Sequence, residues 1–456
     1  MDGLGVRMVW PNRLPAVVLL LLLGSFLGLY WIPFVLTLPA AVLLFIMLAR
    51  LRPGRLVSAP EPAFILVLAR VLVVVPAAGS ATMIAAQYEW QGVPSVLPLV
   101  LGAVCLAVAA LVAYAPRVFW CYLAAQGVVL TLTAYGTARI SDVSLFAEGA
   151  ASALAEGTNP YSISIKNLYD AEQTALFWSP EFIDGDRIMI GFPYLPSTLL
   201  PMVPAHLIGE VRWAMVAALL GTSAVLFRLA TEPVGRLVAA ALPVSPLALR
   251  AIINYYVEPL LLFFLVVLVW AMVRRRGGWG AVGLALLLAG KQYLVVLLPL
   301  ERLVRRRLGL RWLLVGAGAA AALILGFFAM DPEGFWVSVV AVQFSQPFRA
   351  DSTSLAVHIV NLGVPVAPWV LSIGSLAAGL AVAFWVRLRA PSGATWLALG
   401  MALSMLAMVL LSKQAFANYY MLIQGCLMAA VVVWPHELGA PIPDGESQEP
   451  RPAPAA

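Results

Sequence analysis

The chain reads ISDVSLFAEGAASALAEGTNPY from Ile140 to Tyr161, directly after an apolar run long enough to cross a membrane. This stretch opens a polar, acidic loop, 139–192, within an otherwise apolar chain. Loops of roughly fifty residues in a compact chain are usually functional or disordered. Glycine, proline and aromatic residues punctuate this one and it contains short helical patterns, so we predict an ordered, functional loop.

The composition is that of a polytopic membrane protein. Of 456 residues, 62% are hydrophobic and 11% are charged, and the mean hydropathy is +0.94. Soluble domains carry about 25% charged residues. The net charge of +6 lies mostly in short arginine clusters between apolar runs. That pattern orients membrane helices, whereas a nucleic-acid-binding protein would gather its basic residues on one surface.

Several function classes lack their sequence signals. The three cysteines are Cys105, Cys121 and Cys426. They are widely spaced, so we predict no disulfide framework. The three histidines, His206, His358 and His436, form no metal-ligand cluster in the sequence. We interpret His358 as a core residue. A P-loop and a GxGxxG after a strand are also missing from the sequence. We therefore expect neither an ATP-driven pump nor a metal or other cofactor.

The apolar runs predict an all-α fold with about twelve spanning helices, each needing about 20 apolar residues. They are Leu14–Trp31, Phe34–Ala49, Ala63–Ala86, Val93–Ala115, Val118–Ala138, Val211–Leu229, Leu237–Ile252, Val257–Val273, Trp312–Ala329, Pro365–Val386, Thr395–Leu411 and Phe416–Trp434. We divide the chain into a four-helix N-terminal extension (1–117), a membrane core (118–434) and a Pro-rich, disordered cytoplasmic tail (435–456).

The arginine clusters predict the orientation in a plasma (inner) membrane, because basic loops stay cytoplasmic. Both chain ends then lie in the cytoplasm. The loop that follows Asp142 faces outside, as do the shorter segments Asn254–Glu258, Asp331–Ser352 and Ser412–Asn418.

Two apolar segments do not fit this count of spanning helices. Phe192–Gly209 is apolar but contains four prolines, which disrupt helices, so we predict a membrane-surface or half-inserted helix on the outer side. Trp279–Leu303 has arginine clusters at both ends, so it must enter and return as a short helical pair. Gly290–Tyr293 marks the tip, which places Lys291 deep in the protein.

Asp142 and Lys291 are the strongest candidates for chemistry. A carboxylate at the outer membrane surface can take the proton of an attacking hydroxyl; alternatively Asp142 is solvated or caps the next helix. Intramembrane lysines are costly and functional by default, and Lys291 suits a lipid-linked phosphate. Its alternative role is a buried pair with an acid elsewhere. Glu148 and Glu156 are interpreted as solvated faces of a helix.

The remaining candidates each have two interpretations. Glu258 either lies at the start of a helix because the helix dipole favours a carboxylate there, or it lines a substrate pocket. Lys413, Gln414 and Tyr419 are interfacial anchors or recognise sugar and phosphate, and Gln292 accompanies Lys291. Arg349, beside Asp351, contacts a phosphate or lies on a solvated loop. Asn159 and Pro160 predict a turn that Tyr161 packs against, at the edge of the substrate site.

In these features the chain resembles the GT-C superfamily of membrane glycosyltransferases, in particular bacterial mannosyltransferases of the cell envelope. The likeness rests on Asp142 after a membrane helix, the turn Gly157–Tyr161, the aromatic and Pro-rich Phe192–Pro196, and Lys291 at its tip. The resemblance implies sugar transfer from a polyprenyl phosphate to a lipid or glycan acceptor. It also implies Asp142 as base, Lys291 as phosphate contact and no metal.

Two other functions remain open from the sequence. A transporter or flippase of a lipid-linked sugar would also be polytopic, but should show a repeat and broken helices at the midplane, and no repeat is evident. A ligase or polymerase that moves whole glycans would differ only in the size of its substrates.

Overall fold

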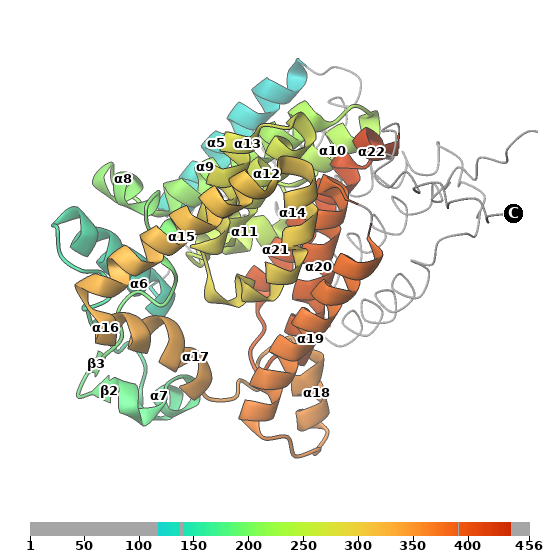
Figure 1. The fold of residues 1–456 in the computed structure, drawn as a ribbon. Coiled ribbons are helices and arrows are strands. Elements are labelled where there is room, and N and C mark those ends of the chain that lie inside the picture. The colour runs from blue at the N-terminus through green and yellow to red at the C-terminus, as the bar shows by residue number, and fades with distance from the viewer. Residues whose placement is uncertain (1–116, 137–139, 391, 439–456) are drawn as a thin grey trace, which may run out of the picture.

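The computed structural model describes residues 117–136, 140–390 and 392–438 (Figure 1). This part of the chain is predominantly helical and contains six helices long and apolar enough to cross a membrane. The protein is therefore an all-α membrane protein in its described part. The four spans expected before Val118 lie outside the described residues.

A bundle of mostly apolar helices forms the core. Its helices are α5 (Val118–Gly136), α9 (Arg212–Leu229), α10 (Pro233–Ala241), α11 (Pro246–Ile253), α12 (Glu258–Arg274), α13 (Gly277–Leu288), α14 (Glu301–Leu308), α15 (Leu310–Met330), α19 (Pro368–Arg389), α20 (Ala394–Leu411) and α21 (Ala417–Val433). Helix α12 packs against α9, α13 and α21, and α20 packs between α19 and α21. Helices α15 and α19 leave most of their apolar surface exposed.

The span expected as Leu237–Ile252 is two helices. Helix α10 ends at Ala241 and α11 begins at Pro246, because Pro243 and Pro246 each remove a backbone donor and clash with the preceding turn. The two helices still form one apolar stretch of 21 residues, Pro233–Ile253. At the break, Ser245 Oγ donates to Gln424 Oε1 of α21 over 2.7 Å.

The predicted helical pair is present, but its second limb is not an α-helix. Gln292–Leu300 forms a 3₁₀-helix, η3, that runs directly into α14. Pro299 lies inside it and lacks a donor. The limb also packs against glycines, since a Cβ on Gly379 or Gly400 would meet the side chains of Val296 and Leu300. Close contact with α19 and α20 favours the tighter 3₁₀ winding.

The loop after Asp142 is ordered, as predicted. It forms α6 (Asp142–Ala155), α7 (Ala171–Phe177), a 3₁₀ turn (Pro180–Phe182) and an antiparallel sheet in the order β1 (Ile165–Lys166), β3 (Arg187–Ile188), β2 (Ile183–Asp184). The sheet was not expected, because strands of two residues are too short to show alternation. Around it lies a small core of its own that includes Phe146, Trp178 and Val342.

The Pro-rich segment after this loop does not span. It breaks into a 3₁₀ turn (Pro196–Thr198) and α8 (Met202–Leu207), which packs against α6 and α9. Between α15 and α19 the chain forms α16 (Pro332–Trp336), a π-helix (Val337–Ala341), α17 (Val342–Ser345) and α18 (Leu355–Asn361). The predicted disordered tail begins as a short helix, α22 (Pro435–Leu438), and its remainder lies outside the described residues.

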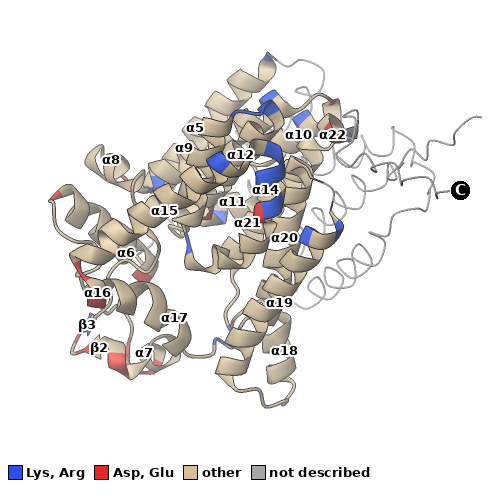
Figure 2. Cartoon of the chain, in the orientation of Figure 1, with Lys and Arg blue, Asp and Glu red and all other residues tan. Residues whose placement is uncertain are grey.

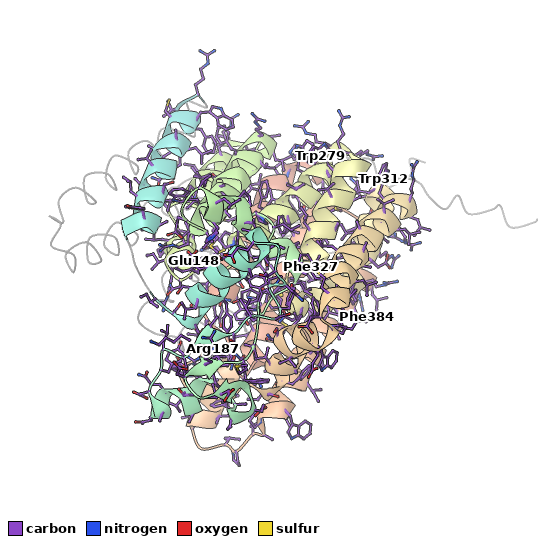
Figure 3. All side chains as sticks on the ribbon, turned by 90° about the vertical axis from the view of Figure 1, so that its left-hand side faces the viewer. Glu148, Arg187, Trp279, Trp312, Phe327 and Phe384 are labelled. Atoms are coloured by element: carbon purple, nitrogen blue, oxygen red, sulfur yellow. The ribbon has the colours of Figure 1, made fainter. Side chains whose placement is uncertain are left out.

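Charge separates along the bundle. Lysines and arginines gather at the end that carries α14, while acidic residues gather around α7, α16 and the small sheet (Figure 2). Trp279 and Trp312 lie near the basic end, and Arg187 marks the opposite end (Figure 3).

Candidate functional site

Asp142 opens α6 without serving as its cap. Ser141 is the N-cap: its Oγ accepts from Ser144 N over 3.2 Å, and Ser144 Oγ accepts from Ser141 N over 2.8 Å. This reciprocal capping box satisfies the helix end. The interpretation of Asp142 as the N-cap is therefore wrong. Its Oδ1 accepts the adjacent Val143 N–H over 2.8 Å.

The surroundings of Asp142 shift its acidity. The side chain is half-buried, and the Tyr169 hydroxyl lies within hydrogen-bonding range. Burial raises the pKa of Asp142 above the ordinary aspartate value; the contacts with Val143 N and Tyr169 and the charge of Arg349 oppose that rise without cancelling it. A carboxylate with a raised pKa is the stronger proton acceptor.

Lys291 lies buried at the tip between α13 and η3. Its Nζ is 2.7 Å from Glu258 Oε1, so the structure contains the buried acid–base pair that the sequence left open as an alternative. Three rings surround the ammonium, at 4.5 Å for Tyr194, 5.1 Å for Tyr293 and 5.3 Å for Tyr419. These tyrosines are partly exposed, so the pair lies behind a ring-lined surface.

Glu258, in the first turn of α12, uses only one of its oxygens. Oε1 also accepts from Asn418 Nδ2 over 2.8 Å and from Tyr293 OH over 3.2 Å. Oε2 and the Asn418 Oδ1 are both buried and have no hydrogen-bond partner among the described residues. Unpaired buried acceptors are rare in proteins.

Tyr194 responds to charges in this cluster and to Asp142. Burial raises the pKa of the Tyr194 hydroxyl, and the charges of Glu258 and Asp142 raise it further. Tyr161 fixes the segment, because it is buried and its hydroxyl donates to the Tyr194 carbonyl oxygen over 2.9 Å.

The other candidates hold the surrounding backbone. Lys413 is buried and donates to the carbonyls of Phe344 (3.0 Å) and Gln346 (2.6 Å), and burial lowers its pKa. Gln414 Nε2 donates to Pro347 O over 3.0 Å. Both side chains therefore tie down the segment that leads to Arg349.

Arg349 lies over two rings, 4.1 Å from Phe177 and 5.0 Å from Phe416. Its guanidinium makes two hydrogen bonds of 2.8 Å to Asp351. Arg349 is thus a partly exposed cation held by Asp351, which is itself exposed.

Two polar groups brace the loops beside the site. Gln292 Nε2 donates to Pro193 O and to Val339 O, both over 3.1 Å. Asn159 Oδ1 accepts from Tyr161 N over 3.0 Å, which makes the predicted turn.

Glu148 and Glu156, both expected on solvated helix faces, have different surroundings. Glu156 is exposed and accepts from Ser152 Oγ. Glu148 instead lies 3.2 Å from His206 of α8 (Figure 3).

The sequence did not single out Tyr169, Tyr194, Tyr293 or Asn418 as site residues. Tyr293 has a signal, since it lies two residues after Lys291. The others reach the site only through the approach of distant segments.

Within residues 117–136, 140–390 and 392–438, no group of three His, Cys, Asp or Glu side chains is arranged to hold a metal ion. Comparisons of the chain with protein-family models, with curated proteins and with solved structures found no match.

Proposed function

We propose that the protein is an integral membrane glycosyltransferase of the GT-C type. It transfers a sugar such as mannose from a polyprenyl-phosphate donor to a lipid or glycan acceptor on the extracytoplasmic side. The observation that supports this proposal is that the buried ammonium of Lys291 lies 4.5 Å from the Tyr194 ring, whose hydroxyl also responds to the charge of a proton-accepting carboxylate, Asp142. A lipid-linked sugar needs such a pair at the end of an apolar bundle.

The proposed reaction transfers one proton and releases one leaving group. Asp142 accepts the proton of the acceptor hydroxyl while that oxygen attacks the anomeric carbon, and the bond from this carbon to the phosphate oxygen breaks. Polyprenyl phosphate leaves with the electron pair. The half-buried position and raised pKa of Asp142 suit a general base.

Lys291 stabilises the leaving phosphate. An ammonium has three N–H donors, and in the described part of the chain Nζ donates one hydrogen bond, to Glu258 Oε1. The donors that remain can bind phosphate oxygens as negative charge develops on them. Arg349, which is paired with Asp351, also acts electrostatically on Asp142.

The charge distribution supports an extracytoplasmic site. The basic end of the bundle is the end expected in the cytoplasm, and the loop that carries Asp142 lies at the opposite end (Figure 2). Tryptophans near the basic end fit an interfacial position there (Figure 3).

The test is sugar transfer by purified protein in lipid vesicles, with a panel of polyprenyl-phosphate sugars and a membrane glycolipid extract. We expect product from the wild type and from Asp184→Asn, a matched change of an exposed acid in β2, but none from Asp142→Asn. Near-normal turnover by Asp142→Asn would exclude this residue as the base. Absence of product with any donor, together with movement of lipid-linked sugar between leaflets, would favour the flippase.

A further inference from the structure

The cluster around Lys291 leaves two buried acceptors unused, Glu258 Oε2 and Asn418 Oδ1, among the described residues. Glu258 is fully buried and Asn418 is 7% exposed. Their other polar atoms bond to each other, Asn418 Nδ2 to Glu258 Oε1 over 2.8 Å. The two unpartnered oxygens therefore belong to neighbouring groups held in one arrangement. Leaving such acceptors unsatisfied is costly, so a donor from outside the described residues would stabilise this arrangement.

The same cluster also offers donors. Lys291 Nζ makes a single hydrogen bond within the described residues, to Glu258 Oε1 over 2.7 Å. Because the two oxygens of a carboxylate share one carbon, Oε2 lies close to the ammonium. A ligand that carries an anionic oxygen beside a hydroxyl can satisfy both groups.

A glycosyl phosphate has this arrangement. Its phosphate is attached to the anomeric carbon, and the sugar hydroxyl nearest to the phosphate is on the adjacent carbon, C2. The partly exposed rings of Tyr194, Tyr293 and Tyr419 provide apolar faces for the C–H groups of a sugar.

We propose that Glu258, oriented by Asn418, determines donor specificity by accepting a hydrogen bond from the C2 hydroxyl of the sugar whose phosphate Lys291 binds. This inference rests on the proposed function and adds the feature of the donor that the site recognises. The competing explanation is that Glu258 only neutralises Lys291. In that case the C2 hydroxyl would contribute nothing to binding.

The first experiment uses the wild type in lipid nanodiscs. Dissociation constants are measured for four probes: polyprenyl-phosphate mannose, polyprenyl-phosphate glucose, their common 2-deoxy form and polyprenyl phosphate alone. Mannose and glucose differ only at C2, so one 2-deoxy sugar serves as reference for both. A hydrogen bond to a charged group predicts that the 2-deoxy form binds about ten to a hundred times more weakly than the better epimer.

The results of this experiment distinguish failure of the C2-hydroxyl inference from failure of the proposed function. Equal affinities for the 2-deoxy form and both epimers would overturn the inference and leave the phosphate site in place. Failure of all four probes to bind would overturn the proposed function as well.

A variant then assigns the effect to Glu258. In Glu258→Gln, an amide of the same size replaces the carboxylate, and the preference for the better epimer over the 2-deoxy form should fall to about threefold or less, as expected for a weaker neutral contact. The preference is a ratio within one protein, so a smaller folded fraction does not alter it. Glu148→Gln, which changes the partner of His206, should keep the wild-type ratio. An unchanged ratio in Glu258→Gln would contradict the assignment.

Discussion

Among individual residues, Ser141 affects the acidity of Asp142 by capping helix α6 in its place. Because Ser141 and Ser144 satisfy the amino-terminal end of α6 between them, the next carboxylate does not serve as the cap. A cap would be held by backbone donors that lower its pKa, whereas burial raises that of Asp142. The serine therefore preserves the basicity of its neighbour.

This balance predicts the pH dependence of transfer. The base acts when deprotonated, so kcat/KM should fall as pH drops through the pKa of Asp142, above the ordinary aspartate value. Tyr169→Phe removes an interaction that lowers this pKa, so the acid limb of the profile should move upward by about one pH unit. A pH profile of kcat/KM for both proteins measures the shift. An identical acid limb would show that Tyr169 does not interact with the base.

The pair of Lys291 and Glu258 makes a prediction about stability. Lys291→Met leaves a buried carboxylate unpaired, which typically costs about 3–5 kcal/mol. The double variant Lys291→Met/Glu258→Leu removes both charges and should recover most of the lost thermal stability, yet bind no donor. Melting temperatures in detergent compare the two variants. A double variant as unstable as the single one would show that the pair does not account for the loss.

The sequence drew attention to charged candidates more readily than to neutral ones. Asp142 and Lys291 stood out because a charge beside or within an apolar run is costly. Tyr169, Tyr194 and Asn418 did not, since tyrosines and amides are common at membrane surfaces and only tertiary packing selects these three. The contacts of Lys413 could not be predicted for the same reason: its burial against two carbonyls depends on a segment about seventy residues away.

At the element scale, close contact between α12 and α13 holds the two halves of the buried pair together. Helix α12 begins with Glu258, and α13 leads to Lys291. Gly283 permits the contact, because a Cβ there would lie 2.8 Å from Leu268 N and 3.0 Å from Phe264 O. Backbone atoms cannot move aside, so the helices would have to separate.

Gly283→Ala is therefore expected to destabilise the protein by about 1–3 kcal/mol through overpacking, and to weaken donor binding. Gly278→Ala, on the same helix, is the control, since its Cβ would meet only ring atoms of Trp312 at 3.9 Å or more. Thermal unfolding and donor titration of both variants provide the measurement. Equal melting temperatures would refute a role for the close approach.

Hydropathy predicted where the apolar helices lie but not how each is wound. The spans expected from Val118 onward coincide with helices within a few residues. Two of these helices, α12 and α21, have 17 residues each and are not among the six that are long and apolar enough to cross a membrane. The break between α10 and α11 and the 3₁₀ winding of η3 depend on proline and on close neighbours, Gly379 and Gly400, which a hydropathy pattern does not report.

At the scale of the whole molecule, the separation of charge predicts the topology. The loop that carries Asp142 should face the outside and α14 the cytoplasm. In a variant without native cysteines, Asp170→Cys should react with an impermeant maleimide on intact cells. Arg306→Cys should react only after permeabilisation. The reverse pattern would place the site in the cytoplasm.

The central claim is that Asp142 acts in the chemical step and not in holding the donor. The most direct measurement determines, for wild type and Asp142→Asn in the same nanodiscs, both the affinity for a polyprenyl-phosphate sugar and the rate of its transfer. If Asp142 is the base, Asp142→Asn should keep the wild-type affinity and transfer sugar at least about a hundredfold more slowly, the usual contribution of a general base. Equal loss of affinity and rate, or transfer at the wild-type rate, would contradict it.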